Sequence, residues 1–409
     1  MIQSSSKKTN IKFLLIVLLL FTNNFFSYIN WDKTLEGQIS YFIYGGIFMA
    51  FLSSNKLIMR KMNFKSIIYC ISIFPFVTII MSNAEFDQSP IESFKVLTPH
   101  FVWFLYFLLH KYNVQEKTLI NIVLWFAIII LAIQIIQQFT YPNALFGIYS
   151  KEQKNNLSLE DNVEIRNGLY RFRLYGSYLI SMIILFFYWI KLQKKYSIKN
   201  ILVILIALIS IYLTLVRQLL AATIFTIFFS FIFVKDNRVK LWAIVSSVFF
   251  AVILYIYADE LFYKLFLQTT EEASTDNIRL LSFAFYWQKI TNNPLTFLFG
   301  NGVPANDSAF GHLSQLWSYT YHFHTADIGF VGQWFYYGII YILIYLYLLY
   351  MLLIKYRKMI PVYIKLFVLS TFLTIAMVYP MTGPFNYIIW CFLLYISDLH
   401  INKSPLRIT

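Results

Sequence analysis

An almost purely apolar run extends from Ile201 to Val234, and Arg217 is its only charged residue. As one helix it would measure ~51 Å at ~1.5 Å per residue, whereas the hydrocarbon core of a bilayer is only ~30 Å thick. The run therefore forms either one over-long helix with an arginine at its middle or two short spans that reverse at residues 217–218. A charge at mid-membrane costs ~3 kcal/mol or more and usually marks a functional site.

The composition is that of a membrane protein. Hydrophobic residues make up 59% of the sequence and charged residues only 13%, which is more apolar surface than a soluble fold can bury. We therefore expect an all-α polytopic membrane protein. The net charge of +14 is explained by basic inner loops, so no nucleic-acid partner is expected. Cys70 and Cys391 fall in apolar runs and predict no disulfide.

Apolar runs of span length predict about 12 transmembrane helices if the Arg217 run counts as two. They lie near residues 11–29, 38–54, 66–82, 96–110, 118–140, 174–190, 200–216, 218–234, 241–257, 327–354, 362–380 and 385–400. Lysines flank the start of the first run and no small-residue cleavage site follows it, so we expect an uncleaved span with the N-terminus inside. The inner segments then hold 22 of the 33 Lys and Arg residues but only three of the 19 acidic residues, as the positive-inside rule requires.

A single span through Arg217 would invert every later segment. It would place the basic stretches at 235–240 and 355–358 outside and the acidic loop after Asp259 inside, against the positive-inside rule. The charge pattern therefore favours a hairpin, with both termini inside and Arg217 at the outer face. The chain then forms one integral membrane domain, residues 1–409, with an outer loop at 141–173 and a large outer loop at 258–326 between spans 9 and 10.

Four arginines fall in outer segments or near the outer face: Arg171, Arg173, Arg217 and Arg279. Arginine binds phosphate through two parallel hydrogen bonds and stays charged when desolvated. Their convergence would suit a lipid pyrophosphate in the outer leaflet. The bland explanation is that they pair with loop acids or phospholipid headgroups. That explanation fits Arg217 least, because Arg217 stands alone in an apolar run.

Three of the six histidines, His312, His322 and His324, gather in one stretch that ends at Asp327. Histidine is the usual general base near neutral pH. Three His and one Asp could also bind zinc, but the spacing matches no strong zinc motif and we expect no metal. A purely structural role, in which these histidines cap the helix that starts near Asp327, is equally open. The Gly-x-Gly at 300–302 lacks the strand and helix of a nucleotide site, so we expect a turn.

Four stretches carry a family resemblance. They are RFRLYGSYLISM with Arg171, Arg173 and Gly176, LTLVRQLLAATIF with Arg217, DNIRLLSFAFYWQKITNNPLTFLFGNG with Arg279, Asn293, Pro294, Gly300 and Gly302, and HTADIGFVGQWFYYGII with His324 and Gly338. In their order, and in the large outer loop before the third-last span, they resemble the O-antigen polymerase/O-antigen ligase family of bacterial membrane glycosyltransferases. Lys289 and Gly300 keep the family's spacing of an arginine and a glycine, with a lysine instead.

The resemblance implies transfer of an oligosaccharide from undecaprenyl pyrophosphate on the outer face of the cytoplasmic membrane. An acceptor hydroxyl would attack the anomeric carbon with inversion, and no nucleotide sugar, metal or other cofactor would take part. The implied catalytic residues are His324, Arg217 and Arg279. The implied substrate-binding residues are Arg171, Arg173, Asp327 and Lys289.

The implied partners are the lipid-linked oligosaccharide and membrane lipid, with a chain-length regulator and a flippase as candidate protein partners. The loose match favours a polymerase of O-antigen, capsule or exopolysaccharide over a ligase that transfers the glycan to lipid A core. Two further functions compete with these, a lipid-linked glycan flippase and a scaffold without chemistry. The long loop at 258–326 disfavours a flippase, and a scaffold leaves Arg217 unexplained. Buried carboxylates, the mark of proton-coupled transport, are expected to be nearly absent.

Overall fold

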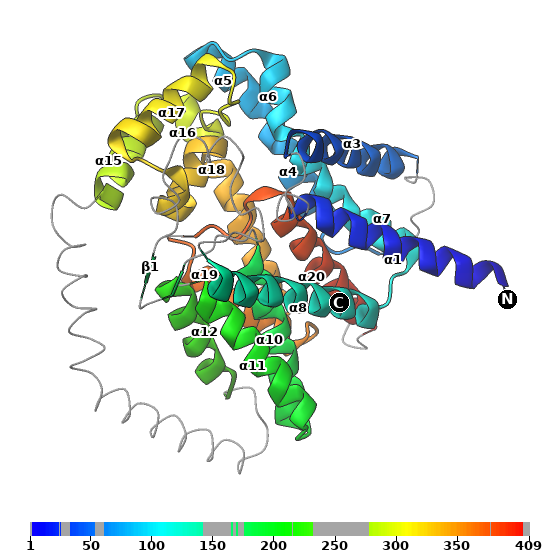
Figure 1. Ribbon diagram of the computed structural model, residues 1–409. Coiled ribbons are helices and arrows are strands. Elements are labelled where there is room, and N and C mark those ends of the chain that lie inside the picture. Colours follow the sequence, from blue (N-terminus) through cyan, green and yellow to red (C-terminus); the bar gives the residue numbers. More distant parts are fainter. Residues whose placement is uncertain are drawn as a thin grey trace.

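The computed structural model describes residues 2–23, 25, 33–53, 61–141, 165–166, 169–170, 176–214, 216–231, 278–376 and 378–403. This part of the chain is nearly all helical (Figure 1). Four of its helical segments are long and apolar enough to cross a membrane: Leu35–Leu52, Lys65–Phe86, Glu116–Thr140 and Thr325–Lys355. Shorter apolar helices cover Ile11–Thr22, Ile198–Leu213, Gln218–Ser230 and Val362–Leu373. The expected class, a helical membrane protein, agrees with these segments.

The first half of the described chain contains α1 (Ile2–Thr22), α3 (Lys33–Leu52), α4 (Lys65–Ile73), η2 (Phe74–Val77), α5 (Thr78–Phe86), α6 (Pro90–Leu97), η3 (Thr98–Phe104), α7 (Leu105–Tyr112), α8 (Glu116–Thr140), α10 (Ser177–Lys194), α11 (Ile198–Leu213) and α12 (Arg217–Ser230). A short antiparallel pair, β1 (Ile165–Arg166) and β2 (Leu169–Tyr170), precedes α10.

The second half contains α15 (Ile278–Thr291), α16 (Pro294–Phe299), α17 (Ala309–Tyr321), η6 (Thr325–Ile328), α18 (Gly329–Tyr350), the π-helical turn η7 (Met351–Lys355), α19 (Val362–Leu373) and α20 (Gly383–Lys403). Helices occupy the expected apolar runs throughout the described residues. The expected span at 241–257 lies outside them.

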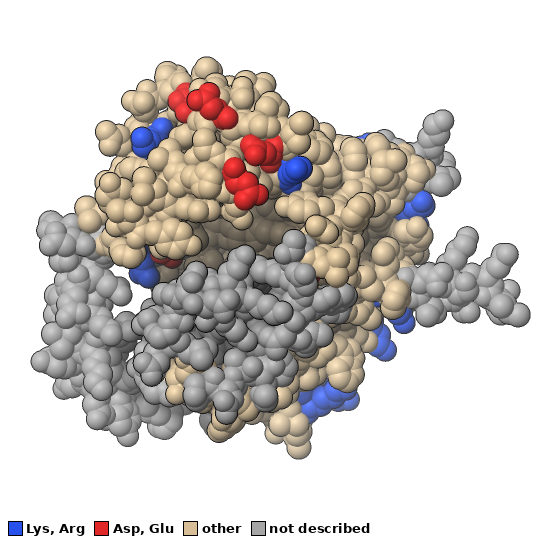
Figure 2. All heavy atoms as spheres, turned by 45° about the horizontal axis from the view of Figure 1, so that its top comes forward, with Lys and Arg blue, Asp and Glu red and all other residues tan. Residues whose placement is uncertain are grey.

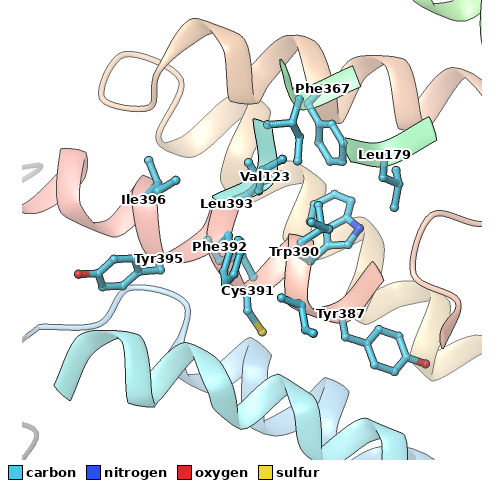
Figure 3. Packing of buried hydrophobic residues seen from close by; sticks show 14 of the residues in the cluster. Val123, Leu179, Phe367, Tyr387, Trp390, Cys391, Phe392, Leu393, Tyr395 and Ile396 are labelled. Carbon is cyan, nitrogen blue, oxygen red and sulfur yellow. The ribbon is translucent and has the colours of Figure 1, made fainter. Parts of the chain in front are cut away.

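The helix α20 forms the centre of the packed core (Figure 3). It is apolar on all sides, as a helix surrounded by other helices should be, and Trp390, Cys391 and Leu394 have no exposed surface. The Cys391 thiol lies 3.5 Å from the carbonyl oxygen of Trp103 in η3. Cys391 and the exposed Cys70 are both free thiols, so the expectation of no disulfide is confirmed.

The helix break predicted at Arg217 is present. The chain leaves α11 at Thr214, Val216 adopts an extended backbone conformation, and α12 begins at Arg217. The two helices have 16 and 14 residues, which makes them ~24 and ~21 Å long.

Two side-chain contacts fix the direction of α11 and α12. The Ser181 hydroxyl, near the start of α10, donates to Ser210 Oγ near the end of α11 at 2.8 Å. The Trp189 indole, near the end of α10, donates to Ser230 Oγ at the end of α12 at 2.7 Å. The chain therefore runs along α10, back along α11 and returns along α12, so the single over-long helix is excluded.

One end of the bundle, here called the basic end, collects the start of α8, the start of α19, the end of α20 and the chain before α4. Glu116 accepts a 2.9 Å hydrogen bond from the Tyr363 hydroxyl and lies 2.9 Å from His400 Nε2. Asn402 Nδ2 donates to the Lys61 carbonyl oxygen at 2.8 Å. The described Lys and Arg residues of the predicted inner segments that follow α3 belong to this end: Lys61, Lys65, Lys111, Lys117, Lys191, Lys194, Lys195, Lys199, Lys355, Arg357, Lys358, Lys365 and Lys403.

Candidate functional site

The opposite end carries a helical cap, residues 278–328, formed by α15, α16, α17 and η6 (Figure 1). The cap occupies the described part of the large loop predicted at 258–326. It packs on α5 and on the first half of α18. Acidic side chains gather over the cap and the adjoining α5–α6 segment (Figure 2). The exposed acids there are Glu85, Asp87, Asp307 and Asp327.

A break in α18 attaches the cap to the bundle. Gly338 has φ 76° and ψ 172° inside the helix, which removes backbone donors from the carbonyls one turn earlier. Asn301 N donates to the Phe335 carbonyl at 2.7 Å and Gly302 N to the Tyr336 carbonyl at 3.0 Å. The expected turn at 300–302 is therefore present, and it supplies the hydrogen bonds that α18 loses at its break.

Both sides of this contact require glycine. A Cβ on Gly300 would lie 2.4 Å from the Tyr336 carbonyl oxygen, and one on Gly338 would lie 2.2 Å from the Leu298 carbonyl oxygen. Gly300 has φ 79°, a conformation that side-chain-bearing residues rarely adopt. Backbone meets backbone here, so no side-chain rotation can relieve an added methyl group.

Gln88, between α5 and α6, holds the cap from the other side. Its amide nitrogen donates to the Val303 carbonyl at 2.9 Å and to Ser93 Oγ at 2.8 Å. Its amide oxygen accepts from Ala305 N at 2.9 Å and from Ser308 Oγ at 2.7 Å. Gln88 is fully buried, and these four bonds satisfy both ends of its amide.

An aromatic cluster between the cap and α18 positions the histidine stretch. Tyr286, Phe310, Trp317 and Phe335 form this buried cluster, and the Tyr286 hydroxyl donates to the Phe323 carbonyl at 3.2 Å. Tyr286 of α15 packs inward, while Leu280, Phe283 and Trp287 of the same helix remain exposed.

His324 is exposed at the start of η6, and its Nδ1 lies 2.8 Å from Ser318 Oγ. If Nδ1 carries the proton and donates to Ser318, Nε2 is the hydrogen-bond acceptor of the ring. Asp327 is exposed in the same turn, and its backbone N–H bonds to the His324 carbonyl at 3.1 Å. An imidazole and a carboxylate thus lie within one turn of chain.

The other two histidines of the stretch occupy positions in or at the end of α17. His322 is exposed and ends α17 with φ 56°, a left-handed helix end. His312 is exposed within α17. Among the described residues, no three His, Cys, Asp or Glu side chains lie close enough to hold a metal ion.

The helix α15 carries Arg279 in its first turn and Lys289 in its last, about 15 Å apart along the helix. Arg279 is half-buried, and Lys289 is exposed with its Nζ 5.7 Å from the Phe285 ring centre and 5.8 Å from the Trp317 ring centre. Because α15 packs against η6, the cap combines an imidazole, a carboxylate and two cations on adjacent elements.

The course of α11 places the backbone of Arg217 at the end of the bundle opposite the basic end. α11 starts beside the basic end, where Lys199 interacts with Lys191 and Glu116 lies close, and runs away from it to the break before Arg217. α19 also starts at the basic end, and the chain after it meets the cap end where Phe330 N donates to the Ile375 carbonyl at 3.0 Å. Arg171 and Arg173 lie outside the described residues.

No family model and no curated protein matches this chain. The site is therefore defined by its own residues.

Sequence reasoning missed a buried polar group at the basic end. Asp398 has no exposed surface and accepts from Asn63 N at 3.1 Å and Asn63 Nδ2 at 2.8 Å. The Tyr106 hydroxyl also donates to it, and His110 Nε2 lies 3.2 Å away. The expected scarcity of buried carboxylates needs this correction. The sequence count placed Asp398 among the three acidic residues of the inner segments, because it falls at the end of the last apolar run.

A second missed group is the buried tyrosine cluster below the cap. Tyr337 and Tyr341 of α18 have ring centres 4.7 Å apart, and His100 Nε2 lies 3.3 Å from the Tyr387 hydroxyl. A tyrosine within an apolar run is easily taken for one more bulky core residue, so the sequence analysis did not single these tyrosines out. The one sequence signal for the cluster was the four-residue spacing of tyrosines at 337, 341 and 345, because residues four apart share a helix face.

Proposed function

We propose that the protein is a membrane glycosyltransferase that polymerises undecaprenyl-pyrophosphate-linked oligosaccharide repeat units into O-antigen, capsule or exopolysaccharide. The observation that carries the proposal is the reversal before Arg217. It brings the one charge of the apolar run to the end of the bundle that bears the cap with Arg279 and His324. A pyrophosphate donor calls for cations, and an acceptor hydroxyl calls for a base.

The proposed reaction breaks the bond between the anomeric carbon and the pyrophosphate oxygen. An acceptor hydroxyl attacks the anomeric carbon from the opposite side, and its proton passes to His324 Nε2. The bonding electrons leave with undecaprenyl pyrophosphate, whose growing charge Arg217 and Arg279 stabilise. Asp327 and Lys289 orient the sugar, and Arg171 and Arg173 complete the pyrophosphate site.

The proposal includes 12 spans in the cytoplasmic membrane, both termini inside and the cap outside between spans 9 and 10. The gathering of lysines and arginines at one end of the bundle supports this orientation, because basic segments stay in the cytoplasm. Membrane lipid surrounds the bundle, and a chain-length regulator and a flippase are the proposed protein partners. A ligase that transfers the glycan to lipid A core would use the same donor chemistry with a different acceptor.

The direct test is an assay with purified full-length protein in detergent or nanodiscs and isolated lipid-linked repeat units as the only substrate. We expect multi-repeat products on a gel together with free undecaprenyl pyrophosphate, with no nucleotide sugar added. The His324→Ala variant is the paired negative control, with an unchanged melting temperature showing that it is folded. Intact repeat units after incubation with a folded wild-type protein would reject the polymerase. Products that form only when lipid A core is supplied would assign the ligase instead.

A further inference from the structure

An open pocket of about 400 Å³ lies at the turn between α10 and α11, at the basic end and far from the cap. Its lining residues are Lys191, Lys194, Lys195, Ser197 and Asn200. The volume falls within the ~300–1,000 Å³ typical of small-molecule sites. Three of the five lining residues are cationic and none is acidic, so the pocket suits an anion.

Among the described residues, none of the three pocket lysines forms a salt bridge with an acidic side chain. Glu116 is the carboxylate that interacts with Lys191, and it already accepts hydrogen bonds from Tyr363 and lies 2.9 Å from His400. Burial lowers the pKa of Lys191, Glu116 raises it, and Lys117 and Lys199 lower it again. The C-terminal end of α10 carries only about half a negative charge, which does not neutralise the positive charge of the three lysines.

The backbone adds to the positive field. Ser197 is the N-cap of α11, and its side chain makes no capping hydrogen bond, so the hydroxyl is available to a ligand. The start of a 16-residue helix carries about half a positive charge. Lysine ammonium groups, a hydroxyl and a helix start together are donors that a phosphate group uses.

The surface that leads away from the pocket is apolar. Ile198, Leu202, Leu205 and Ile209 of α11 are 67%, 56%, 49% and 45% exposed. Their spacing of three or four residues puts them on one side of the helix. This stripe begins beside the pocket and continues along α11, which is the arrangement needed by a phosphate that carries an acyl chain.

We propose that this pocket binds the phosphate of an anionic phospholipid, with an acyl chain along the α11 stripe. The lysines hold the phosphate at the level of the membrane surface, and the apolar stripe distinguishes a lipid from a soluble phosphate. The bound lipid would tie the α10–α11 turn to the leaflet at the basic end. The proposal is independent of the glycosyltransferase function, since it uses none of the cap residues.

Native mass spectrometry of the purified full-length protein tests the site. The probes are phosphatidylglycerol and phosphatidylcholine with identical acyl chains. We expect the wild type to retain phosphatidylglycerol in preference to phosphatidylcholine. The Lys191→Gln/Lys194→Gln/Lys195→Gln variant should lose at least about tenfold in phosphatidylglycerol affinity, because each basic residue near the surface contributes about fivefold. Arginine at the same three positions should restore binding.

The matched control is Lys355→Gln/Arg357→Gln/Lys358→Gln, which removes the same charge from the same end but outside the pocket. It should keep phosphatidylglycerol binding within about twofold of wild type, because these three residues do not line the pocket and share no partner with the bound phosphate. An equal loss in both variants would mean general surface attraction and would overturn the site. So would undiminished binding by the pocket variant at normal melting temperature.

Two further measurements separate a lipid from a soluble phosphate. Leu202→Gln/Leu205→Gln should weaken phosphatidylglycerol binding while leaving the three lysines in place. The deacylated headgroup, glycerophosphoglycerol, should compete poorly. If the deacylated headgroup or inorganic phosphate displaces the lipid at equal concentration, the pocket takes a soluble phosphate and the lipid assignment is wrong.

Discussion

Arg217 is the residue on which the proposed chemistry depends most. It begins α12 at the reversal of an apolar hairpin, where an arginine without a task would be costly. We predict that Arg217→Ala and Arg217→Lys both cut polymer formation about a hundredfold, because one preorganised transition-state contact is worth ~3 kcal/mol. Lysine should fail as well because it offers a point charge rather than a planar pair of donors.

Polymer length on a gel and protein level on a blot measure this prediction together. Both variants should accumulate normally, since removing a charge makes membrane insertion easier. Lys95→Ala, an exposed cation on α6 near the cap, is the matched control and should leave polymer unchanged. Full-length polymer from Arg217→Ala at normal protein level would remove Arg217 from the site.

Gln88 supports the cap through three hydrogen bonds, to Val303, Ala305 and Ser308, and a fourth bond to Ser93 holds its amide in place. We predict that Gln88→Leu lowers the free energy of unfolding by about 3 kcal/mol or more, since each buried group left without a partner costs ~1–3 kcal/mol. A fall in the melting temperature in detergent measures it. Gln288→Leu, on the exposed side of α15, is the control with the same change of side chain. A Gln88→Leu variant that melts with wild type would show that the network does not hold the cap.

At the scale of the helices, the sequence pattern was sufficient to predict the reversal between α11 and α12 but not the break in α18. The reversal of α11 and α12 was predictable because the cost of a buried arginine and the charge of the flanking segments pointed the same way. The break in α18 was not, because the expected span at 327–354 is apolar on both sides of Gly338. Its cause is the backbone of residues 301 and 302, more than 30 positions earlier in the chain.

That break gives a prediction at the scale of the element. Gly338→Ala places a methyl group against the Leu298 carbonyl in a conformation that costs side-chain-bearing residues ~1–3 kcal/mol, so the melting temperature should fall sharply. Gly46→Ala is the control, because Gly46 lies in α3 with nothing within 4 Å of the added carbon. Replacing glycine there should be neutral or stabilise by up to ~1 kcal/mol. Equal melting temperatures for the two variants would contradict the tight contact.

The direction of α12 can be tested by cross-linking. Gln193 Nε2 donates to Ser230 Oγ at 3.2 Å, so Gln193→Cys and Ser230→Cys in a Cys70→Ser background should be joined by a short bifunctional thiol reagent. In a single over-long helix, Ser230 would lie a whole membrane away from the end of α10. After a protease has cut the chain between the two positions, cross-linked protein still migrates as one species of full length, whereas protein without the cross-link separates into two fragments. The absence of any cross-link in a folded variant would argue against the hairpin.

At the scale of the whole molecule, charge counting anticipated the arrangement of the described ends. Segments predicted to lie inside, such as those at Lys61, Glu116 and His400, do meet at one end. The docking of the cap could not be anticipated, because Gln88 and Ser308 are 220 positions apart and neither has a distinctive local pattern. The burial of Asp398 was hidden for the same reason, since its partners Asn63 and Tyr106 are remote in sequence.

The proposed orientation of the molecule rests on the same asymmetry. Reporter fusions placed after Asn237 and after Asn306 should report opposite sides of the membrane, the first inside and the second outside. Asn306 lies in the cap, so its position also locates the proposed site. If both fusions report the same side, the cap cannot face the outer leaflet, and the proposed meeting of Arg217 with a lipid pyrophosphate fails.

The central claim, that this protein joins lipid-linked repeat units, is tested most directly by a gel of surface polysaccharide from a strain that lacks it. We predict that the ladder of long chains collapses to a single repeat unit and returns when the wild-type protein is supplied. Full-length chains that remain on the lipid carrier would instead identify a ligase, and repeat units trapped inside the cell would identify a flippase. A ladder unchanged by the deletion would contradict the proposed function.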